Sequence, residues 1–114
     1  MMHELGVISA MVKTIEGIVK EQGLTQVHKL VLEVGELSGI VPGYMEACYP
    51  AAVYKTFMEN CVLELETIPG IVRCKACGRE FNATARDFHC PDCGSQDMEI
   101  LSGNDVMIRE IECS

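Results

Sequence analysis

Residues 74–94 read CKACGREFNATARDFHCPDCG and contain two Cys-x-x-Cys pairs with twelve residues between them. Two residues between paired cysteines let both thiolates reach one metal ion from a tight turn, and four thiolates satisfy the tetrahedral preference of zinc. Gly78 and Gly94 follow the pairs and can adopt the positive φ that closes such a turn. The stretch therefore predicts a small ribbon built around a structural Zn(II) ion. The predicted zinc ligands are Cys74, Cys77, Cys90 and Cys93.

Two other uses of these cysteines fit the pattern less well. A redox dithiol of the thioredoxin type has one Cys-x-x-Cys at a helix start, not two symmetric pairs. A catalytic zinc site keeps an open position and usually includes histidine or carboxylate ligands. His89, next to Cys90, is an alternative ligand or a neighbour of the site, although an exposed loop histidine is the simpler interpretation.

The residues before the ribbon predict two helices and two strands. Apolar residues recur every three or four positions in residues 5–19, which indicates an amphipathic helix, and Gly23 is placed to cap it. Residues 27–34 and 61–68 alternate as strands do. Pro42 suits the first turn of a second helix, because its missing N–H would be unpaired there. The apolar face of that helix comprises Met45, Cys48, Tyr49, Ala52 and Val53.

A third strand follows the ribbon. Residues 106–112 alternate in hydrophobicity but have no strand near them in sequence, so we expect them to return and pair with the first half of the chain. This predicts an α+β fold with two helices packed on a small mixed three-stranded sheet and an inserted four-cysteine zinc ribbon. The predicted domains are residues 1–69 as an α/β domain, 70–103 as the zinc ribbon and 104–114 as the returning strand.

Composition narrows the class of protein. The formal net charge is −8 at pH 7, which disfavours nucleic acid as a partner because phosphate backbones repel an acidic surface. No apolar run is long enough for a membrane span, and no secretory signal is recognisable, so we expect a cytoplasmic protein without membrane contact. No nucleophile with an adjacent base can be picked out, which predicts a protein that is not an enzyme.

His3 is a second candidate metal ligand. An imidazole near a free amino terminus can combine with the terminal amine and the backbone amides between them. The resulting planar four-nitrogen set suits Ni(II) and Cu(II) better than zinc. Most early histidines are surface residues or helix-terminal groups, however, so its position alone does not assign nickel to His3.

Several motifs along the chain occur together in one known family. Residues 2–5 read MHEL, residues 32–39 read LEVGELSG, and Val41-Pro42 follows them. Ile68-Pro69 ends the second predicted strand, before the CxxC…CPxC ribbon. In this combination the chain closely resembles the HypA/HybF family of hydrogenase-maturation nickel chaperones over essentially its whole length.

The resemblance implies a metallochaperone that carries Ni(II) as transient cargo. It would bind nickel in the domain of residues 1–69 and deliver it to the large subunit of a nickel–iron hydrogenase, with a structural zinc site. A HypB-type GTPase is the implied partner, and in some bacteria urease and its maturation proteins are also served. A monomer and a homodimer both remain compatible with the sequence.

The resemblance also implies which residues bind nickel. The histidine after the initiator methionine corresponds to His3, and Glu4 supports the site. Met1 is an additional residue, so two donor sets arise. A start at Met1 offers its amine and the amides of Met2 and His3; a start at Met2 offers its amine and the amides of His3 and Glu4.

A zinc-ribbon interaction or regulatory module without nickel delivery is the alternative function. Four basic residues close to the ribbon would then contact an acidic partner. They are Arg73, Lys75, Arg79 and Arg86.

Overall fold

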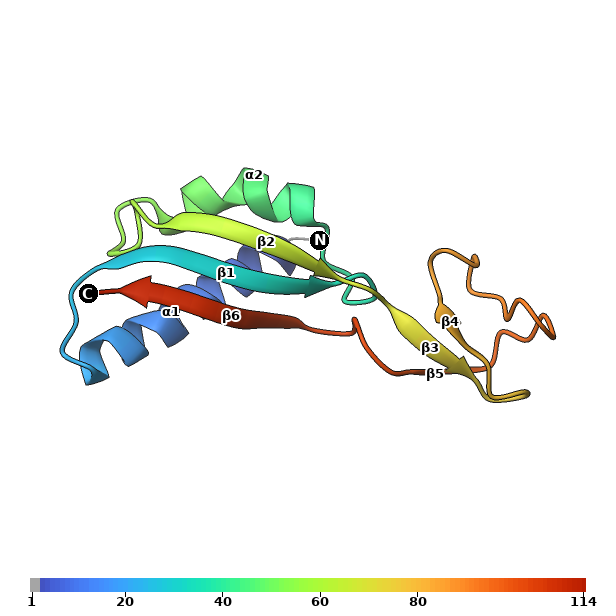
Figure 1. Ribbon diagram of the computed structural model, residues 1–114. Coiled ribbons are helices and arrows are strands. Elements are labelled where there is room, and N and C mark those ends of the chain that lie inside the picture. Colours follow the sequence, from blue (N-terminus) through green and yellow to red (C-terminus); the bar gives the residue numbers. More distant parts are fainter. Residues whose placement is uncertain (1–2) are drawn as a thin grey trace.

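The structure of the protein is a computed structural model that describes residues 3–114, apart from the side chain of His3. Met1 and Met2 lie outside the described residues. The molecule is elongated, with extents of 54 × 27 × 17 Å, and consists of two three-stranded sheets arranged end to end (Figure 1). Among residues 3–114, neither helix is both long and apolar enough to cross a lipid bilayer.

The first sheet is mixed, as predicted. Its central strand β1 (Val27–Gly35) pairs in parallel with β2 (Val62–Ile68) and antiparallel with β6 (Val106–Cys113). The strand β6 therefore does return from beyond the ribbon to the first half of the chain. One irregularity in its register lies between Val31 and Leu32 of β1.

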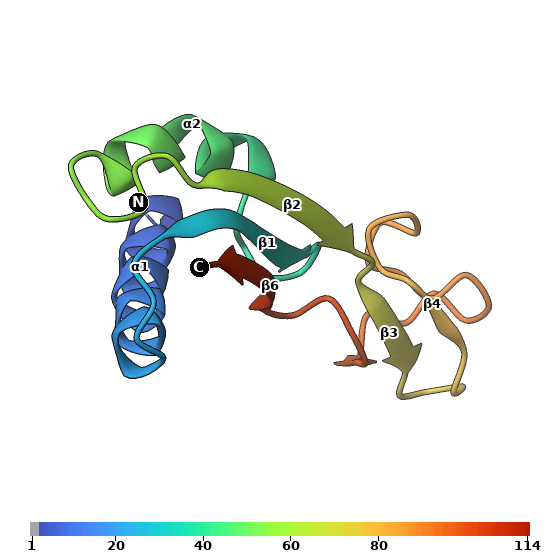
Figure 2. The same ribbon diagram turned by 60° about the vertical axis from the view of Figure 1, so that its left-hand side comes forward.

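Helices α1 (His3–Glu21) and α2 (Pro42–Val53) contact each other, and both pack on one face of this sheet (Figures 1 and 2). Alternation along β1 places Leu30, Leu32 and Val34 on the helix side, where all three are buried. The two helices contribute every third or fourth residue to the same core. The buried helical residues are Ile8, Ile15, Val19, Met45, Tyr49 and Val53.

The helix boundaries follow local chemistry. Gly23 has a φ of 69°, and the amides of Gly23 and Leu24 bond the carbonyls of Lys20 and Val19 at 3.2 and 2.9 Å. These two bonds satisfy carbonyls that the end of α1 would otherwise leave unpaired. Pro42 is the first residue of α2, as its missing N–H predicted.

The second sheet belongs to the cysteine-rich segment. Its central strand β3 (Ile71–Cys74) pairs antiparallel with β4 (Glu80–Asn82) and β5 (Met98–Ile100). These strands have three or four residues each, too short for an alternation to be recognised in the sequence. They enclose a small separate core of Val72, Cys74, Phe81, Ala83 and Cys90, with Leu37 and Met98 packed against it.

The chain passes between the two sheets twice, through residues 68–71 and 100–106 (Figure 1). The two passages touch each other at Gly103, where an added Cβ would meet the carbonyl oxygen of Pro69 at 2.5 Å. Gly103 also has a φ of 79°, so both space and backbone conformation favour glycine there. The loop after β1 joins the same junction, because the amide of Leu37 donates to the carbonyl of Gly103 at 2.7 Å.

Candidate metal centre

The two Cys-x-x-Cys units fold into two matching turns. In the first, the amide of Cys74 bonds the carbonyl of Arg79, and the amide of Gly78 bonds the carbonyl of Cys74, both at 2.8 Å. In the second, the amide of Cys90 bonds the carbonyl of Ser95, and the amide of Gly94 bonds the carbonyl of Cys90, both at 2.9 Å. Each turn closes on its glycine, and the φ values of 81° at Gly78 and 73° at Gly94 confirm the conformation predicted for them.

The turns bring all four predicted cysteines together. Every pair of sulfur atoms lies within 4.8 Å, and the Sγ atoms of Cys74 and Cys93, and of Cys77 and Cys90, are 3.5 Å apart. A tetrahedral ion with metal–sulfur bonds of about 2.3 Å, as zinc makes, separates its sulfurs by roughly 3.8 Å. The four thiols therefore fit one tetrahedral ion that prefers sulfur.

The pKa values of the four thiols shift in opposite directions within each close pair. The backbone N–H of Cys77 bonds the Cys74 sulfur and lowers its pKa to about 6. For Cys77, the amide of Arg79 lowers the pKa, but hydrogen bonding to Cys90 and desolvation raise it to about 12 overall. Within each close pair one thiol ionises easily and the other does not, because two adjacent thiolates repel each other. A divalent cation removes this repulsion.

The site is buried on one side and exposed on the other. Cys74 and Cys90, the first residue of each pair, belong to the small core, whereas Cys77 and Cys93 are exposed. The ion would therefore connect the core of the second sheet to its surface turns. Arg79 pairs with Asp92 at 2.9 Å and adds a contact between the two turns.

His89 is not part of this group. It is exposed, and its Nδ1 lies 2.7 Å from the carbonyl oxygen of Asp87. The interpretation as a loop histidine therefore fits better than that as a ligand. Phe88 beside it is also exposed, with a φ of 60°, so it does not contribute to the small core.

The basic side chains near the ribbon mostly have acidic partners within it. Arg73 lies 3.3 Å from Glu80 and 3.9 Å from Glu99, and Lys75 lies 3.9 Å from Asp97. Exposed pairs of this kind contribute little to stability, but they cancel the local positive charge. The ribbon therefore lacks the concentrated positive surface that an acidic partner would need.

The structure describes the N-terminal candidate only in part. Met1, Met2 and the side chain of His3 lie outside the described residues, and His3 is the first residue of α1. Glu4 follows it in the first turn, where its Oε2 accepts a hydrogen bond from the amide of Val41 at 2.9 Å. This contact ties the start of α1 to the start of α2, and nothing in the sequence had indicated it.

Glu36 is a further residue whose role sequence reasoning missed. A glutamate in a loop would ordinarily be a solvated surface carboxylate. The Oε1 of Glu36 instead accepts hydrogen bonds from the amide of Gly70 at 2.8 Å and from the side-chain amide of Asn82 at 3.0 Å. These bonds connect the loop after β1 to the second sheet. The amide of Gly70 and, next, that of Asn82 hold the pKa of Glu36 below its ordinary value.

The other three cysteines lie away from the metal group, in and around the core of the first sheet. Cys61 is buried, and its desolvation raises the pKa of its thiol. The hydroxyl of Tyr49 donates to its carbonyl at 3.0 Å. Cys48 and Cys113 are half-buried against the same core. Their positions fit small apolar packing residues.

Comparisons with known proteins agree with this geometry. Residues 2–113 match the family model described as hydrogenase/urease nickel incorporation, metallochaperone, hypA. The hydrogenase maturation factor HypA of Geobacter metallireducens is 35% identical over 111 residues, which cover 97% of this chain and 98% of that protein. HypA of Nostoc sp. is 37% identical over 113 residues, with 97% and 95% coverage.

The fold also has a solved counterpart. The solution structure of the Ni metallochaperone HypA from Helicobacter pylori superposes with a TM-score of 0.70 and covers 98% of this chain and 97% of that one. The sequences of the two are 22% identical, so this likeness concerns the fold. It confirms the predicted arrangement of two helices, a mixed three-stranded sheet and a four-cysteine ribbon.

Proposed function

This chain belongs to the HypA family of nickel-incorporation metallochaperones, which act in hydrogenase maturation, and we propose that it binds one Ni(II) ion at its N-terminus and delivers it to the large subunit of a nickel–iron hydrogenase. The observation that carries the proposal is the family match over residues 2–113. The family is one of metallochaperones, and we propose that this member likewise has no catalytic turnover.

The proposed nickel donors are the His3 imidazole, backbone nitrogens and the amino group of Met1 or Met2, with Glu4 supporting the site. A backbone amide must lose its proton to bind nickel. In the middle of a helix, this loss would break the hydrogen bond that the amide donates. The first four N–H groups of a helix have no partner within it, however. Because α1 begins at His3, the amides of His3 and Glu4 can lose their protons without breaking the helix. The positive end of the helix dipole also stabilises the anionic nitrogens.

Glu4 would act by position. Its carboxylate bonds the amide of Val41, so the first turn of α1 is attached to the segment that leads into α2. A nickel ion at His3 would then lie where the helices of the first sheet meet the loop of residues 36–41. Glu36 and Leu37 of this loop contact the second sheet.

For the four cysteines we propose structural Zn(II), held by Cys74, Cys77, Cys90 and Cys93. Four thiolates complete a tetrahedron and leave no open position, so the ion would stabilise the ribbon instead of activating a substrate. The proposed domains remain 1–69 for nickel, 70–103 for zinc and 104–114 for the returning strand.

The proposed setting is the cytoplasm, where thiols stay reduced. A HypB-type GTPase is the proposed partner in nickel loading, and urease is a second proposed client because the family description includes it. The alternative of a ribbon that contacts an acidic partner draws no support from Arg73, Lys75 and Arg79, which all pair with carboxylates.

Calorimetric titration of the zinc-loaded protein with Ni(II) tests the nickel site. We expect one ion per chain, lost in His3→Ala and kept in His89→Ala, a control at an exposed histidine of the ribbon. Chains that start at Met1 and at Met2 should both bind, and their absorption spectra should identify the donor set of each. Unchanged nickel binding in His3→Ala would rule out the proposed site.

Delivery needs a separate measurement. The nickel-loaded protein is mixed with a metal-free hydrogenase large subunit, and the nickel content of the separated subunit is measured. We expect transfer to exceed that from His3→Ala and from free nickel at the same concentration. If the wild-type protein, His3→Ala and free nickel transfer equal amounts of nickel, nickel binding by the chain has no role in delivery.

A further inference from the structure

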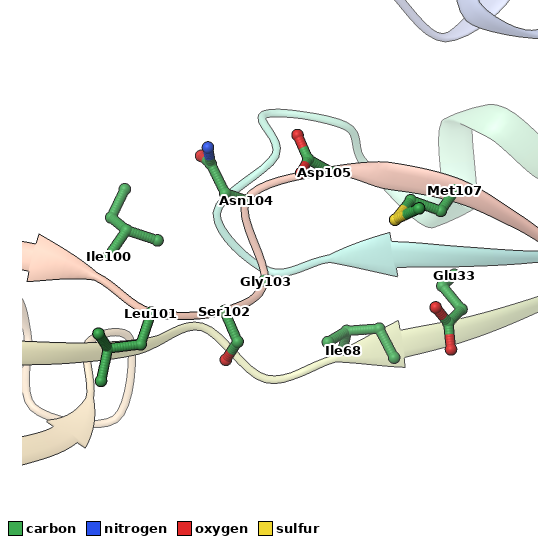
Figure 3. A pocket seen from close by; sticks show the side chains of 9 residues that line it. All are labelled: Glu33, Ile68, Ile100, Leu101, Ser102, Gly103, Asn104, Asp105 and Met107. Atoms are coloured by element: carbon green, nitrogen blue, oxygen red, sulfur yellow. The ribbon is translucent and has the colours of Figure 1, made fainter.

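A hollow of about 310 Å³ lies where the first sheet meets the second, on the sheet face that the helices leave open (Figure 3). The register places Glu33 of β1 and Met107 of β6 opposite each other on this face. Ile68 ends β2 at the hollow, and residues 100–105 form its other side. The hollow is separate from the four cysteines and from the helix side of the sheet.

Large apolar side chains gather around this hollow. Ile100, Leu101 and Met107 are 48%, 38% and 58% exposed, and all three line it. They come from the end of β5, the linker after it and the start of β6, so only the folded junction brings them together. Exposed apolar side chains that converge on a concavity mark an interaction site more often than scattered ones do.

The same hollow carries negative charge. Glu33 lies beside Met107, and Asp105 also lines the hollow, although its carboxylate points away from Glu33 (Figure 3). No lysine, arginine or histidine lines it, and among the described residues neither carboxylate has an ion pair. Neighbouring carboxylates on the same face do have one: Glu64 pairs with Lys29, and Glu66 pairs with Arg109. Within residues 3–114, Glu33 and Asp105 therefore have no ion pair of their own beside the apolar surface, although Arg109 crosses β1 to Glu66, the residue opposite Glu33.

We propose that this hollow docks a segment of a partner protein that inserts one large apolar side chain flanked by lysine or arginine. The apolar side chain would cover Ile100, Leu101 and Met107, and a cation would lie against Glu33 or Asp105. The volume suits single side chains and not a folded element. A second copy of this chain is the less suitable occupant, because two chains of net charge −8 repel each other.

This docking site goes beyond nickel binding and requires no metal in the N-terminal site. Its test therefore uses zinc-loaded, nickel-free protein. Three synthetic peptides of equal length serve as probes: one with leucine between lysines, one with leucine between glutamates and one with serine between lysines. Binding is followed by NMR through the methyl groups of Ile100, Leu101 and Met107.

Only the lysine–leucine–lysine peptide should shift these methyl signals in a saturable way, and more weakly at high salt. Met107→Ser and Glu33→Gln should each weaken its binding by roughly tenfold, which corresponds to about 1.4 kcal/mol. Val62→Ser and Glu112→Gln are matched controls at the far end of the same sheet face and should bind normally. Val62 is 62% exposed, so its replacement tests general apolar adhesion.

Three results would overturn the proposal. Equal shifts with all three peptides would mean that the hollow does not select the combination, and equal weakening by the controls would place binding elsewhere. Self-association in sedimentation that Met107→Ser abolishes would identify a second copy as the occupant. The methyl signal of buried Leu32 shows whether each variant is folded. Since nickel is absent throughout, a failure here leaves the nickel proposal standing.

Discussion

The side-chain amide of Asn82 donates a hydrogen bond of 3.0 Å to the carboxylate of Glu36, although the two residues are 46 positions apart. The same carboxylate oxygen accepts the amide of Gly70 at 2.8 Å. One side chain from the loop after β1 thus bonds both the entry to the second sheet and its strand β4. Leu37, the next residue, packs on the core of the second sheet. This junction fixes how the two sheets sit relative to each other.

Replacing Glu36 by alanine should loosen the orientation of the second sheet without unfolding either sheet. The variant loses both hydrogen bonds, while Leu37 keeps its apolar contact. NMR residual dipolar couplings of the two sheets check this, since a fixed orientation gives one alignment tensor and a loose one gives two. Glu112→Ala, an exposed glutamate far from the junction, serves as control. A single tensor in Glu36→Ala would show that Leu37, Gly70 and Gly103 are enough to fix the orientation of the second sheet.

Acid should weaken the same junction. Bonding to the amides of Gly70 and Asn82 lowers the pKa of Glu36 below 4.5, the ordinary value, so the folded state favours the carboxylate. The stabilisation is therefore present above that value and is lost as pH falls through the lower folded pKa. The carboxyl carbon of Glu36 should titrate with a midpoint below 4.5, and the amide of Gly70 should follow it. A midpoint at or above 4.5 would contradict the hydrogen bonds from Gly70 and Asn82 to Glu36. The zinc content of the protein is measured in parallel, since acid also protonates thiolates.

Cys90→Ser, or removal of the metal by a chelator, should unfold the second sheet and spare the first. The core of the second sheet contains few residues, whereas a structural zinc ion contributes on the order of 10–16 kcal/mol in small finger peptides. The NMR signals of Val72 and Phe81 should move to random-coil chemical shifts, while those of Leu30 and Leu32 should keep their dispersion. Some nickel affinity should survive. Cys48→Ser is the control, because Cys48 lies outside the metal group. Dispersed Val72 and Phe81 signals in the chelated protein would show that the ion is dispensable.

Leu32→Ala should lower the free energy of unfolding of the first sheet by about 2–5 kcal/mol. Leu32 is fully buried between β1 and the two helices, so the deletion leaves a cavity. Ile18→Ala shortens a side chain of α1 that is 40% exposed and should lower the same quantity by clearly less. Urea unfolding of the zinc-loaded protein measures both. Similar losses in the two variants would mean that burial does not govern stability here.

Glu4→Gln keeps an acceptor oxygen and should weaken the hydrogen bond that connects the starts of the two helices. Glu4→Ala has no acceptor and should abolish this bond. Hydrogen exchange of the Val41 amide is the direct readout, because this amide donates to Glu4. We expect protection to fall in the order wild type, Gln, Ala. The exposed residue Glu46 on α2 offers a control in Glu46→Ala. Unchanged protection of Val41 in Glu4→Ala would assign the amide to another acceptor.

The parts of the fold that the sequence predicted are those governed by local rules. Periodicity located the helices and the strands of the first sheet, and the glycines after each cysteine pair indicated their positive φ. The return of β6 followed from a strand pattern that had no nearby partner. In each case the physical cause lies within a few residues of the signal.

The missing parts depend on contacts between distant residues. Strands β3 to β5 have only three or four residues each, so their pattern was too brief to recognise. Glu36 looked like any surface glutamate, since nothing near it in sequence indicates Gly70 or Asn82. The basic residues of the ribbon suggested a binding surface, but Arg73, Lys75 and Arg79 pair with acidic residues that lie elsewhere in the ribbon sequence. The nickel ligands stay a prediction, because Met1, Met2 and the His3 side chain lie outside the described residues.

The double passage of the chain through the junction has a consequence for the order of folding. Pairing of β6 with β1 closes a loop that contains the whole segment between Ile68 and Val106, and the entropic cost of closure grows with loop length. A metal ion that folds the ribbon first brings Gly70 and Gly103 together and so shortens the loop that remains to be closed. In kinetic terms, the ion bound by four cysteines would accelerate the pairing of β6 in the first sheet, although it has no contact with that sheet.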